Sequence, residues 1–239
     1  RGMKVARTEG DLVDAFHTAR TEAKAAFGDD AVYIEKFLEK PRHIEIQVLG
    51  DGQGNAVHLG ERDCSLQRRH QKVWEEGPSP ALNESMRSEI GEVCAKAMRD
   101  LGYLGVGTIE FLYEDGKFYF IEMNTRIQVE HPVTEAVTGL DLVEWQLRIA
   151  SVEKLPLSQA QVPLNGHAVE ARIYAEDPER GFLPSTGALV ALKFPEGVRV
   201  DTGVEQGSAI SPYYDPMIAK MIAHAPTREA AWRAPTPGA

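Results

Sequence analysis

Two short apolar segments, each interrupted by a glutamate, constrain the fold of this chain most. Residues 107–113 (Gly-Thr-Ile-Glu-Phe-Leu-Tyr) and 117–124 (Lys-Phe-Tyr-Phe-Ile-Glu-Met-Asn) flank the dipeptide Asp115-Gly116, a pattern that predicts a β-hairpin. Glu110 and Glu122 stand where a buried strand favours apolar residues. A buried carboxylate is costly unless it is paired or binds a cation. The hairpin therefore indicates a site for a divalent metal.

The length of the hairpin loop decides whether the two glutamates meet. A two-residue loop, Asp115-Gly116, would place them on opposite faces of a regular ribbon. A three-residue loop that includes Glu114 would pair Tyr113 with Lys117 and bring both glutamates to one face, and we favour this loop. The alternative is that Glu122 is a solvated edge residue. Residues 118–121 do not alternate, which favours a strand buried on both faces.

The residues that follow Asn124 suggest an anion site beside the metal. Arg126, Gln128 and Glu130 alternate with two apolar residues. An extended segment would place these three side chains on one side, where a guanidinium binds an oxyanion and a carboxylate accepts a proton. A surface Arg/Glu pair of little energetic value explains the same periodicity equally well.

Residues 122–135 (Glu-Met-Asn-Thr-Arg-Ile-Gln-Val-Glu-His-Pro-Val-Thr-Glu) resemble the signature of the biotin carboxylase family, ATP-grasp enzymes that make carboxybiotin from bicarbonate, ATP and biotin. The resemblance covers nearly the whole chain and continues at residues 35–38, 41–47, 61–72, 166–173, 182–185 and 213–218. Pro132, residues 171–178 and residues 213–217 resemble acyl-CoA carboxylase α chains more than pyruvate carboxylase.

The resemblance implies an α+β ATP-grasp fold. It assigns residues 1–37 to the remainder of the lid subdomain, 38–155 to the ATP-grasp core with the metal and bicarbonate site, and 156–239 to an incomplete C-terminal subdomain with an antiparallel sheet. By the same resemblance, we expect the N-terminal α/β domain of the family and the family's glycine-rich phosphate loop to be missing from these 239 residues. Since backbone N–H groups of such a loop cradle phosphates, we expect the 239-residue chain alone to have at most trace activity.

The resemblance also implies residue roles. The Mg²⁺ (or Mn²⁺) ligands would be Glu110, Glu122 and Asn124. The ATP-binding residues would be Glu35, Lys36, Phe37, Leu38, His43, Gln67 and His70. Bicarbonate would be bound by Lys72, Arg126, Gln128 and the backbone of Val129. Glu130 would be the base, Arg126 would stabilise the biotin enolate, and Arg172 would hold that enolate or the phosphate.

The implied function is ATP-dependent carboxylation of biotin on a carrier domain through carboxyphosphate, the first half-reaction of an acyl-CoA carboxylase. Bicarbonate is a poor electrophile and must be phosphorylated first, a reaction that requires fixed cations and metal ions rather than a protein nucleophile. The implied partners are a biotin carboxyl carrier domain and a carboxyltransferase subunit, in a homodimer or larger assembly. Two alternatives remain open: another ATP-grasp ligase that activates a different carboxylate, and a non-catalytic interaction or dimerisation module.

Charge and composition narrow the class of ligand. The chain has 36 Asp and Glu against 26 Lys and Arg, a net charge of -10, which disfavours nucleic acid. The basic run at residues 68–72 therefore suits a small anion. No segment approaches the ~20 apolar residues that cross a membrane. The two cysteines, Cys64 and Cys94, indicate a reducing compartment, either the cytoplasm or, in a eukaryote, the mitochondrial matrix.

Periodicity and turn residues predict the remaining elements. We expect strands at residues 3–7, 32–37, 44–49, 56–59, 169–173 and 188–192, and helices at 11–27, 84–101, 141–150 and from 227. Asn83 and Gly102 delimit the second helix, whose inward stripe would be Met86, Ile90, Val93, Ala97 and Leu101. Residues 235–239 cannot continue the last helix, because they contain two prolines.

Overall fold

The computed structural model describes residues 2–155 and 157–234. The chain forms two compact units, which meet in sequence at Pro41 and Arg42. The smaller unit contains one helix, α1 (Glu9–Phe27), whose N-cap Thr8 forms a capping box with Asp11. The predicted strands at residues 3–7 and 32–37 are wrong, because these segments have no neighbouring strand among the described residues of this unit to satisfy their backbone groups.

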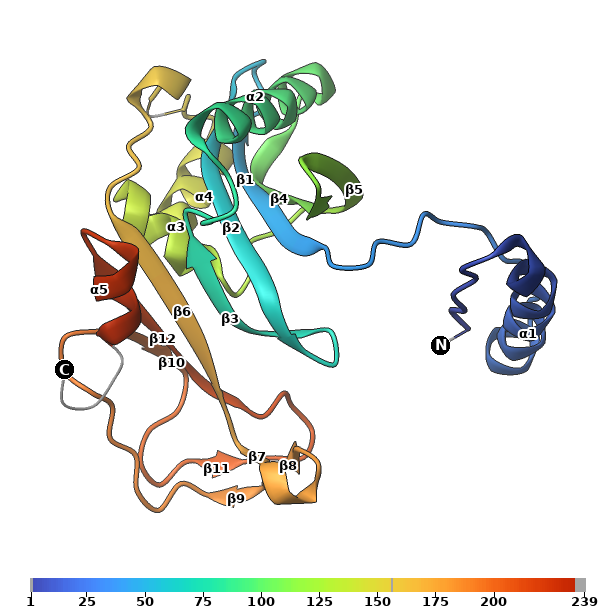
Figure 1. Cartoon of the computed structure of the whole chain (residues 1–239). Helices are drawn as coiled ribbons and strands as arrows, with labels where there is room; N and C mark the ends of the chain where they lie inside the picture. The colour runs from blue at the N-terminus through green and yellow to red at the C-terminus, as the bar shows by residue number, and fades with distance from the viewer. Residues whose placement is uncertain (1, 156, 235–239) are drawn as a thin grey trace. The chain divides into compact units, whose positions relative to one another are not determined.

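The larger unit is built on one eight-stranded antiparallel sheet with the order β10-β12-β6-β3-β2-β1-β4-β5 (Figure 1). Its strands are β1 (Arg42–Asp51), β2 (Ala56–Arg68), β3 (Gln71–Gly77), β4 (Leu104–Glu114), β5 (Lys117–Asn124), β6 (His167–Tyr174), β10 (Arg199–Thr202) and β12 (Met217–Ala225). Two small sheets pair β7 (Glu176–Asp177) with β8 (Leu183–Pro184), and β9 (Gly187–Ala188) with β11 (Ala209–Ile210). The predicted strand at 188–192 is therefore wrong beyond Ala188.

The described residues of the larger unit also form four α-helices and two 3₁₀ segments. They are α2 (Glu84–Leu101), α3 (His131–Thr138), α4 (Leu142–Ala150), α5 (Arg228–Arg233), η1 (Gln159–Gln161) and η2 (Pro178–Arg180). The predicted helices at 84–101, at 141–150 and from 227 are confirmed, and the caps Asn83, Asp141 and Thr227 each accept a backbone N–H bond. Residues 235–239 lie outside the described residues. No described helix is both long and apolar enough to cross a membrane.

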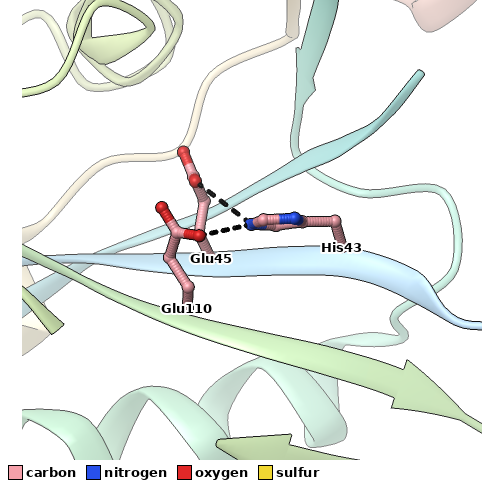
Figure 2. Close-up of side chains that lie close together, drawn as sticks. All are labelled: His43, Glu45 and Glu110. Carbon is pink, nitrogen blue, oxygen red and sulfur yellow. Dashed lines mark ion pairs between the residues drawn. The ribbon is translucent and has the colours of Figure 1, made fainter. Parts of the chain in front are cut away.

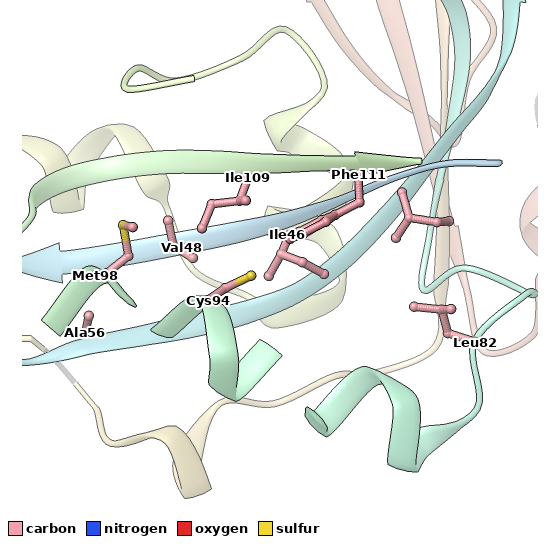
Figure 3. Close-up of a cluster of buried hydrophobic side chains, with 9 residues drawn as sticks. Ile46, Val48, Ala56, Leu82, Cys94, Met98, Ile109 and Phe111 are labelled. Carbon is pink, nitrogen blue, oxygen red and sulfur yellow. The ribbon is translucent and has the colours of Figure 1, made fainter. Parts of the chain in front are cut away.

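Helix α2 covers one face of β1, β2 and β4 (Figure 3). The cluster between them contains Ile44, Ile46, Val48, Ala56, Leu82, Cys94, Met98, Ile109 and Phe111. The predicted inward stripe of α2 is wrong in part, because Val93 and Leu101 are 63% and 73% exposed. On its buried side, α2 carries a glycine, Gly91, where it meets His58. A Cβ atom at Gly91 would lie 2.5 Å from the His58 ring, so the absence of a side chain lets the helix pack closely at this point.

The opposite face of the same strands is divided between an apolar and a polar region. Helix α4 packs on the apolar region with Leu142, Trp145 and Ile149 against Leu49, Val57, Leu59 and Val106. Because side chains alternate along a strand, Glu45 and Gln47 point to this side of β1, away from Ile44 and Ile46. Both are fully buried, and they begin the polar region.

The β4–β5 hairpin differs from the sequence prediction in its loop and in its burial. Glu114 pairs with Lys117, so the loop has two residues, and a register shift between Glu110 and Phe111 leaves Ile121 unpaired. Because of that shift, Glu122 pairs with Glu110. The two glutamates therefore lie on one face of the sheet, as predicted, but the cause is the register shift and not a three-residue loop. The expected burial on both faces is wrong, since Phe120 is 65% exposed on this edge strand.

Candidate active site

A row of charged residues crosses four neighbouring strands on the polar region of the sheet. Arg62 on β2 pairs with Glu45 on β1, Glu45 pairs with Glu110 on β4, and Glu110 pairs with Glu122 on β5. Paired residues of antiparallel strands project to the same face. The row runs from the buried Arg62 to the exposed Glu122 at the sheet edge.

Lys72 on β3 connects three carboxylates of this region. Its ammonium nitrogen donates to Glu45 Oε2 at 2.6 Å, Glu130 Oε1 at 2.6 Å and Glu110 Oε1 at 3.0 Å. Burial disfavours a charged lysine, but Glu45 and the other carboxylates outweigh it and raise the pKa of Lys72 above its usual value. Lys72 is therefore a permanent cation at the centre of the site.

Glu45 and Glu110, two of the carboxylates that contact Lys72, are held in their ionised forms. Burial alone would raise the pKa of Glu45, but the Arg62 and Lys72 charges lower it to about 2. Burial alone would also raise the pKa of Glu110, but His43 and Lys72 outweigh this effect and lower that pKa to about 2. Figure 2 shows His43, Glu45 and Glu110 converging, with His43 Nε2 2.7 Å from Glu110 Oε2 and 3.9 Å from Glu45 Oε2. Gln67, predicted to bind nucleotide, contacts His43 Nδ1 at 3.0 Å.

The Arg62 guanidinium fixes the buried end of the row. Its Nε donates to Glu45 Oε1 at 2.6 Å, and its Nη1 donates to Gln47 Oε1 at 2.6 Å and Thr134 Oγ1 at 2.7 Å. Glu45 and Arg62 were not among the residues predicted from the sequence. Glu45 and Gln47 alternate regularly with Ile44, Ile46 and Val48, a pattern that predicts a solvent-facing side for the two polar residues, so no local signal marked Glu45 as buried.

Glu130 lies between two cations at the start of α3. In addition to its Lys72 contact, its Oε2 accepts a bond from Arg172 Nη2 at 2.9 Å. Arg172 also donates from Nε to Glu75 Oε1 at 2.7 Å, and Lys220 donates to the Val129 carbonyl at 2.5 Å. The structure therefore brings together Lys72, Glu130, the Val129 backbone and Arg172.

Arg126 does not share the side of Gln128 and Glu130, as the alternation predicted. Gln128 and Glu130 are buried, whereas Arg126 is exposed and donates to Asn124 Oδ1 at 3.1 Å and the Ile127 carbonyl at 3.2 Å. The extended-segment prediction is wrong because the chain bends at Arg126 and enters a turn at Val129 and Glu130. Arg126 remains hydrogen-bonded to Asn124, a predicted metal ligand.

The predicted metal ligands lie at the β4–β5 end of the row, and carboxylate and amide oxygens are ligands that Mg²⁺ prefers. Glu110 Oε1 accepts bonds from Lys72, from Gln128 Nε2 at 2.7 Å and from Asn124 Nδ2 at 3.0 Å. The Asn124 oxygen accepts from Arg126, and Glu122 is exposed on the edge strand opposite Glu110. The chemistry of Glu110, Glu122 and Asn124 is thus that of a Mg²⁺ site, and a metal there stays a prediction.

The other predicted nucleotide residues lie outside the helices and strands. Glu35, Lys36, Phe37 and Leu38 belong to the smaller unit and form neither helix nor strand, and Leu38 is buried there. His70 is exposed in the β2–β3 turn and has a φ of 67°.

Comparisons with known proteins agree with the fold. Residues 1–158 match the family described as "Carbamoyl-phosphate synthase L chain, ATP binding domain", and residues 170–236 match "Biotin carboxylase C-terminal domain". The chain is 57% identical to the biotin carboxylase of Haemophilus influenzae, covering 98% of this chain and 52% of the relative. It is 54% identical to the mitochondrial methylcrotonoyl-CoA carboxylase subunit alpha of Mus musculus, covering 97% of this chain and 33% of the relative.

A solved structure has the same fold. The biotin carboxylase domain dimer of Hydrogenobacter thermophilus 2-oxoglutarate carboxylase, in complex with MgADP, ADP and bicarbonate, superposes with a TM-score of 0.87 at 50% identity, over 97% of this chain and 52% of that chain. The chain thus spans about a third to a half of the relatives it matches. From these matches, the α+β ATP-grasp fold predicted from the sequence is confirmed, and the chain belongs to the biotin carboxylase family.

Proposed function

We propose that the chain forms the metal, bicarbonate and biotin-enolate region of an enzyme that carboxylates biotin at the expense of ATP. The observation that carries this proposal is the position of Glu130, whose two carboxylate oxygens contact Lys72 and Arg172. A carboxylate fixed beside the Lys72 ammonium can take a proton from a small anion that Lys72 binds, and its contact with Arg172 connects it to the part of the site proposed for the biotin enolate.

Bicarbonate binds among Lys72, Gln128 and the backbone of Val129. Arg126, which is exposed and contacts Asn124 in this structure, turns from that contact to the bound anion. Glu130 removes the proton of bicarbonate. The resulting oxyanion attacks the γ-phosphorus of ATP, ADP leaves, and carboxyphosphate forms. Carboxyphosphate then breaks its bond between carbon and the bridging oxygen, releasing CO₂ and phosphate. The phosphate takes the proton of the biotin ureido nitrogen, the enolate of biotin attacks CO₂, and Arg126 and Arg172 stabilise the enolate charge. The cations support each step by stabilising charge as it develops.

The nucleotide and its metal occupy the neighbouring end of the site. Glu110, Glu122 and Asn124 hold Mg²⁺ or Mn²⁺, which neutralises the phosphate oxygens when bound. In the larger unit, His43, Gln67 and His70 contact the ribose and phosphates. The adenine contacts Glu35, Lys36, Phe37 and Leu38 are assigned by the family resemblance alone and belong to the smaller unit. The proximity of His43 to Glu110 supports a nucleotide that extends from the ribose to the metal.

The parent enzyme is the biotin carboxylase component of an acyl-CoA carboxylase. Its biotin arrives on a carboxyl carrier domain, and carboxybiotin leaves to a carboxyltransferase subunit. The enzyme forms a homodimer or a larger assembly, as the dimer of the 2-oxoglutarate carboxylase relative supports. It acts in the cytoplasm or, if the source is a eukaryote, in the mitochondrial matrix, where the mouse relative is placed by its name.

Release of ADP by the full-length enzyme tests the proposed function. The enzyme should release ADP in a bicarbonate-dependent manner, and free biotin should be carboxylated at the same time. ADP release that needs another carboxylate and ignores bicarbonate would instead support a different ATP-grasp ligase. No ADP release from the full-length enzyme under any of these conditions would support a non-catalytic module.

A further inference from the structure

A second pair of glutamates lies beside the active site, and the reaction described above does not use it. Glu75 on β3 and Glu170 on β6 stand directly opposite each other in the antiparallel ladder. Both residues are 0% exposed. Since directly paired side chains are ~5 Å apart at Cβ, two ionised carboxylates here would repel each other strongly in a medium of low dielectric.

The two glutamates have different partners. Glu75 Oε1 accepts a hydrogen bond from Arg172 Nε at 2.7 Å. Neither oxygen of Glu170, nor the second oxygen of Glu75, has a hydrogen-bond partner among the described residues. An ionised carboxylate without a donor is costly to bury. One proton therefore resides on the pair, and Glu170 carries it, because Glu75 has the guanidinium to compensate its charge.

The charged groups around the pair agree with this distribution. Burial raises the pKa of Glu170 well above its usual value, and Glu75 adds to that effect while Lys220 and Arg172 oppose it. Burial also raises the pKa of Glu75 to about 7, against the Arg172 charge and with Glu130 and Glu45 adding to the effect. The more easily ionised member of the pair is thus Glu75, which contacts Arg172, and it is mainly ionised above about pH 7.

The positive charge of Arg172 requires a compensating anion at this position, because a second cation lies beside it. Across the β6–β12 ladder its direct partner is Lys220, a second cation. Arg172 therefore lies between Lys220 on one side and the carboxylates of Glu75 and Glu130 on the other. Without the Glu75 charge, Arg172 would keep Glu130 as its anionic partner and would be free to turn about that contact.

We propose that ionised Glu75 is a positioning residue that fixes the Nε edge of Arg172, so that the Nη2 edge faces Glu130 and the bound substrate, while Glu170 beside it stays protonated. This inference rests on the proposed function of Arg172. Glu75 does not touch substrate; it acts through the orientation of the guanidinium. Glu170 supplies a neutral, buried neighbour and does not hold the guanidinium.

The two paired glutamates provide matched variants for a test in the full-length enzyme. Glu75→Gln should lower kcat for carboxylation of free biotin ~10- to 100-fold, the size expected for a misplaced catalytic group, and should leave bicarbonate-dependent ATP cleavage without biotin within about threefold of wild type. Glu170→Gln, which has the shape of the protonated acid, should leave both rates within about threefold. A purely structural role would lower both reactions of Glu75→Gln equally.

A double variant tests whether Glu75 acts through Arg172. Glu75→Gln should cause no further loss of biotin carboxylation in an Arg172→Ala background, because coupled residues are not additive. If Glu75→Gln does not fold, Glu75→Asp is the variant to test, because it keeps the negative charge on a shorter side chain. Glu75→Asp should again lower the rate of biotin carboxylation and not that of ATP cleavage without biotin.

Three results would overturn the inference: wild-type biotin carboxylation in Glu75→Gln, equal losses in both reactions, or an additive loss in the double variant. A fourth result would also overturn it, namely an equal loss of biotin carboxylation in Glu170→Gln and Glu75→Gln. In each case an active wild-type enzyme would show that the proposed function itself stands. Failure of the proposed function would instead appear as wild-type enzyme without bicarbonate-dependent ADP release.

Discussion

Glu45 and Glu110 lie directly opposite each other on β1 and β4, and one ammonium group, that of Lys72, donates to both at 2.6 and 3.0 Å. Two like charges in a largely buried site are stable only with such compensation. Arg62 adds a second positive charge at the Glu45 end. The Glu110 end has no arginine contact of this kind among the described residues; His43 contacts Glu110 there, and this is the end for which we propose a Mg²⁺ ion.

The base assignment predicts the behaviour of Glu130→Gln in the full-length enzyme. Glutamine keeps the shape of the side chain but cannot take a proton from bicarbonate. We expect bicarbonate-dependent ATP cleavage to fall at least ~100-fold, with nucleotide affinity within about threefold of wild type. Steady-state ADP release and equilibrium nucleotide binding measure the two quantities. Turnover near the wild-type rate would show that another group is the base.

The enolate assignment predicts a selective loss in Arg172→Ala. Removing the guanidinium should reduce biotin carboxylation more than ATP cleavage driven by bicarbonate alone, because the enolate forms only in the second part of the reaction. Parallel assays with and without free biotin give the ratio of the two losses. Equal losses would count against this role of Arg172.

The buried ion network predicts a large stability effect at Arg62. Arg62→Met removes the only cation that contacts Glu45 Oε1 within the described part of the chain, and breaking a buried pair costs about 3–5 kcal/mol. Lys96→Met removes an exposed i,i+4 pair with Asp100 and should change the free energy of unfolding by less than about 0.5 kcal/mol. Urea denaturation compares the two variants. Similar small losses in both would mean that the Arg62 network contributes little.

The lowered pKa of Glu110 predicts a specific acid dependence of folding. Its pKa is about 2 in the folded chain against a usual value of 4.5, so the folded state binds fewer protons than the unfolded state between these values. The stabilisation that this provides is fully present above pH 4.5 and is lost as the pH falls toward 2. The unfolding free energy of Glu110→Gln should therefore fall less steeply over this window than that of wild type. Identical slopes would mean that Glu110 is not held ionised by its neighbours.

Local sequence signals predicted those parts of the fold that depend on neighbours in sequence. The α2 boundaries follow from Asn83 and Gly102, which act within one helical turn. The hairpin between β4 and β5 follows from its turn residues. The pairing register of this hairpin could not be predicted from its turn residues. The register has a shift beside Glu110, and the pairing of β4 with Asn124 and Glu122, rather than the loop, sets that shift. The exposure of Phe120 likewise depends on the position of β5 at the sheet edge, which no local pattern contains.

The candidate site was predicted in part for the same reason. Glu110 was recognisable as a carboxylate in an apolar strand, and the signature around Glu130 carried a strong resemblance. The contact of Lys72 with Glu45 joins β3 to β1, and that of Arg172 with Glu75 joins β6 to β3. These contacts depend on strand order and register across the sheet, so they became visible only in the folded chain. The exposed position of Arg126 depends on a bend that alternation could not predict.

The most direct test of the account follows one oxygen atom of bicarbonate through the full-length enzyme. If a bicarbonate oxygen attacks the γ-phosphorus and carboxyphosphate later breaks between carbon and that oxygen, the oxygen remains on phosphate. With ¹⁸O-labelled bicarbonate and free biotin, mass spectrometry of the released phosphate should detect one ¹⁸O atom per turnover, and Glu130→Gln should release almost no labelled phosphate. Unlabelled phosphate from a wild-type enzyme that carboxylates biotin would contradict the activation of bicarbonate at this site.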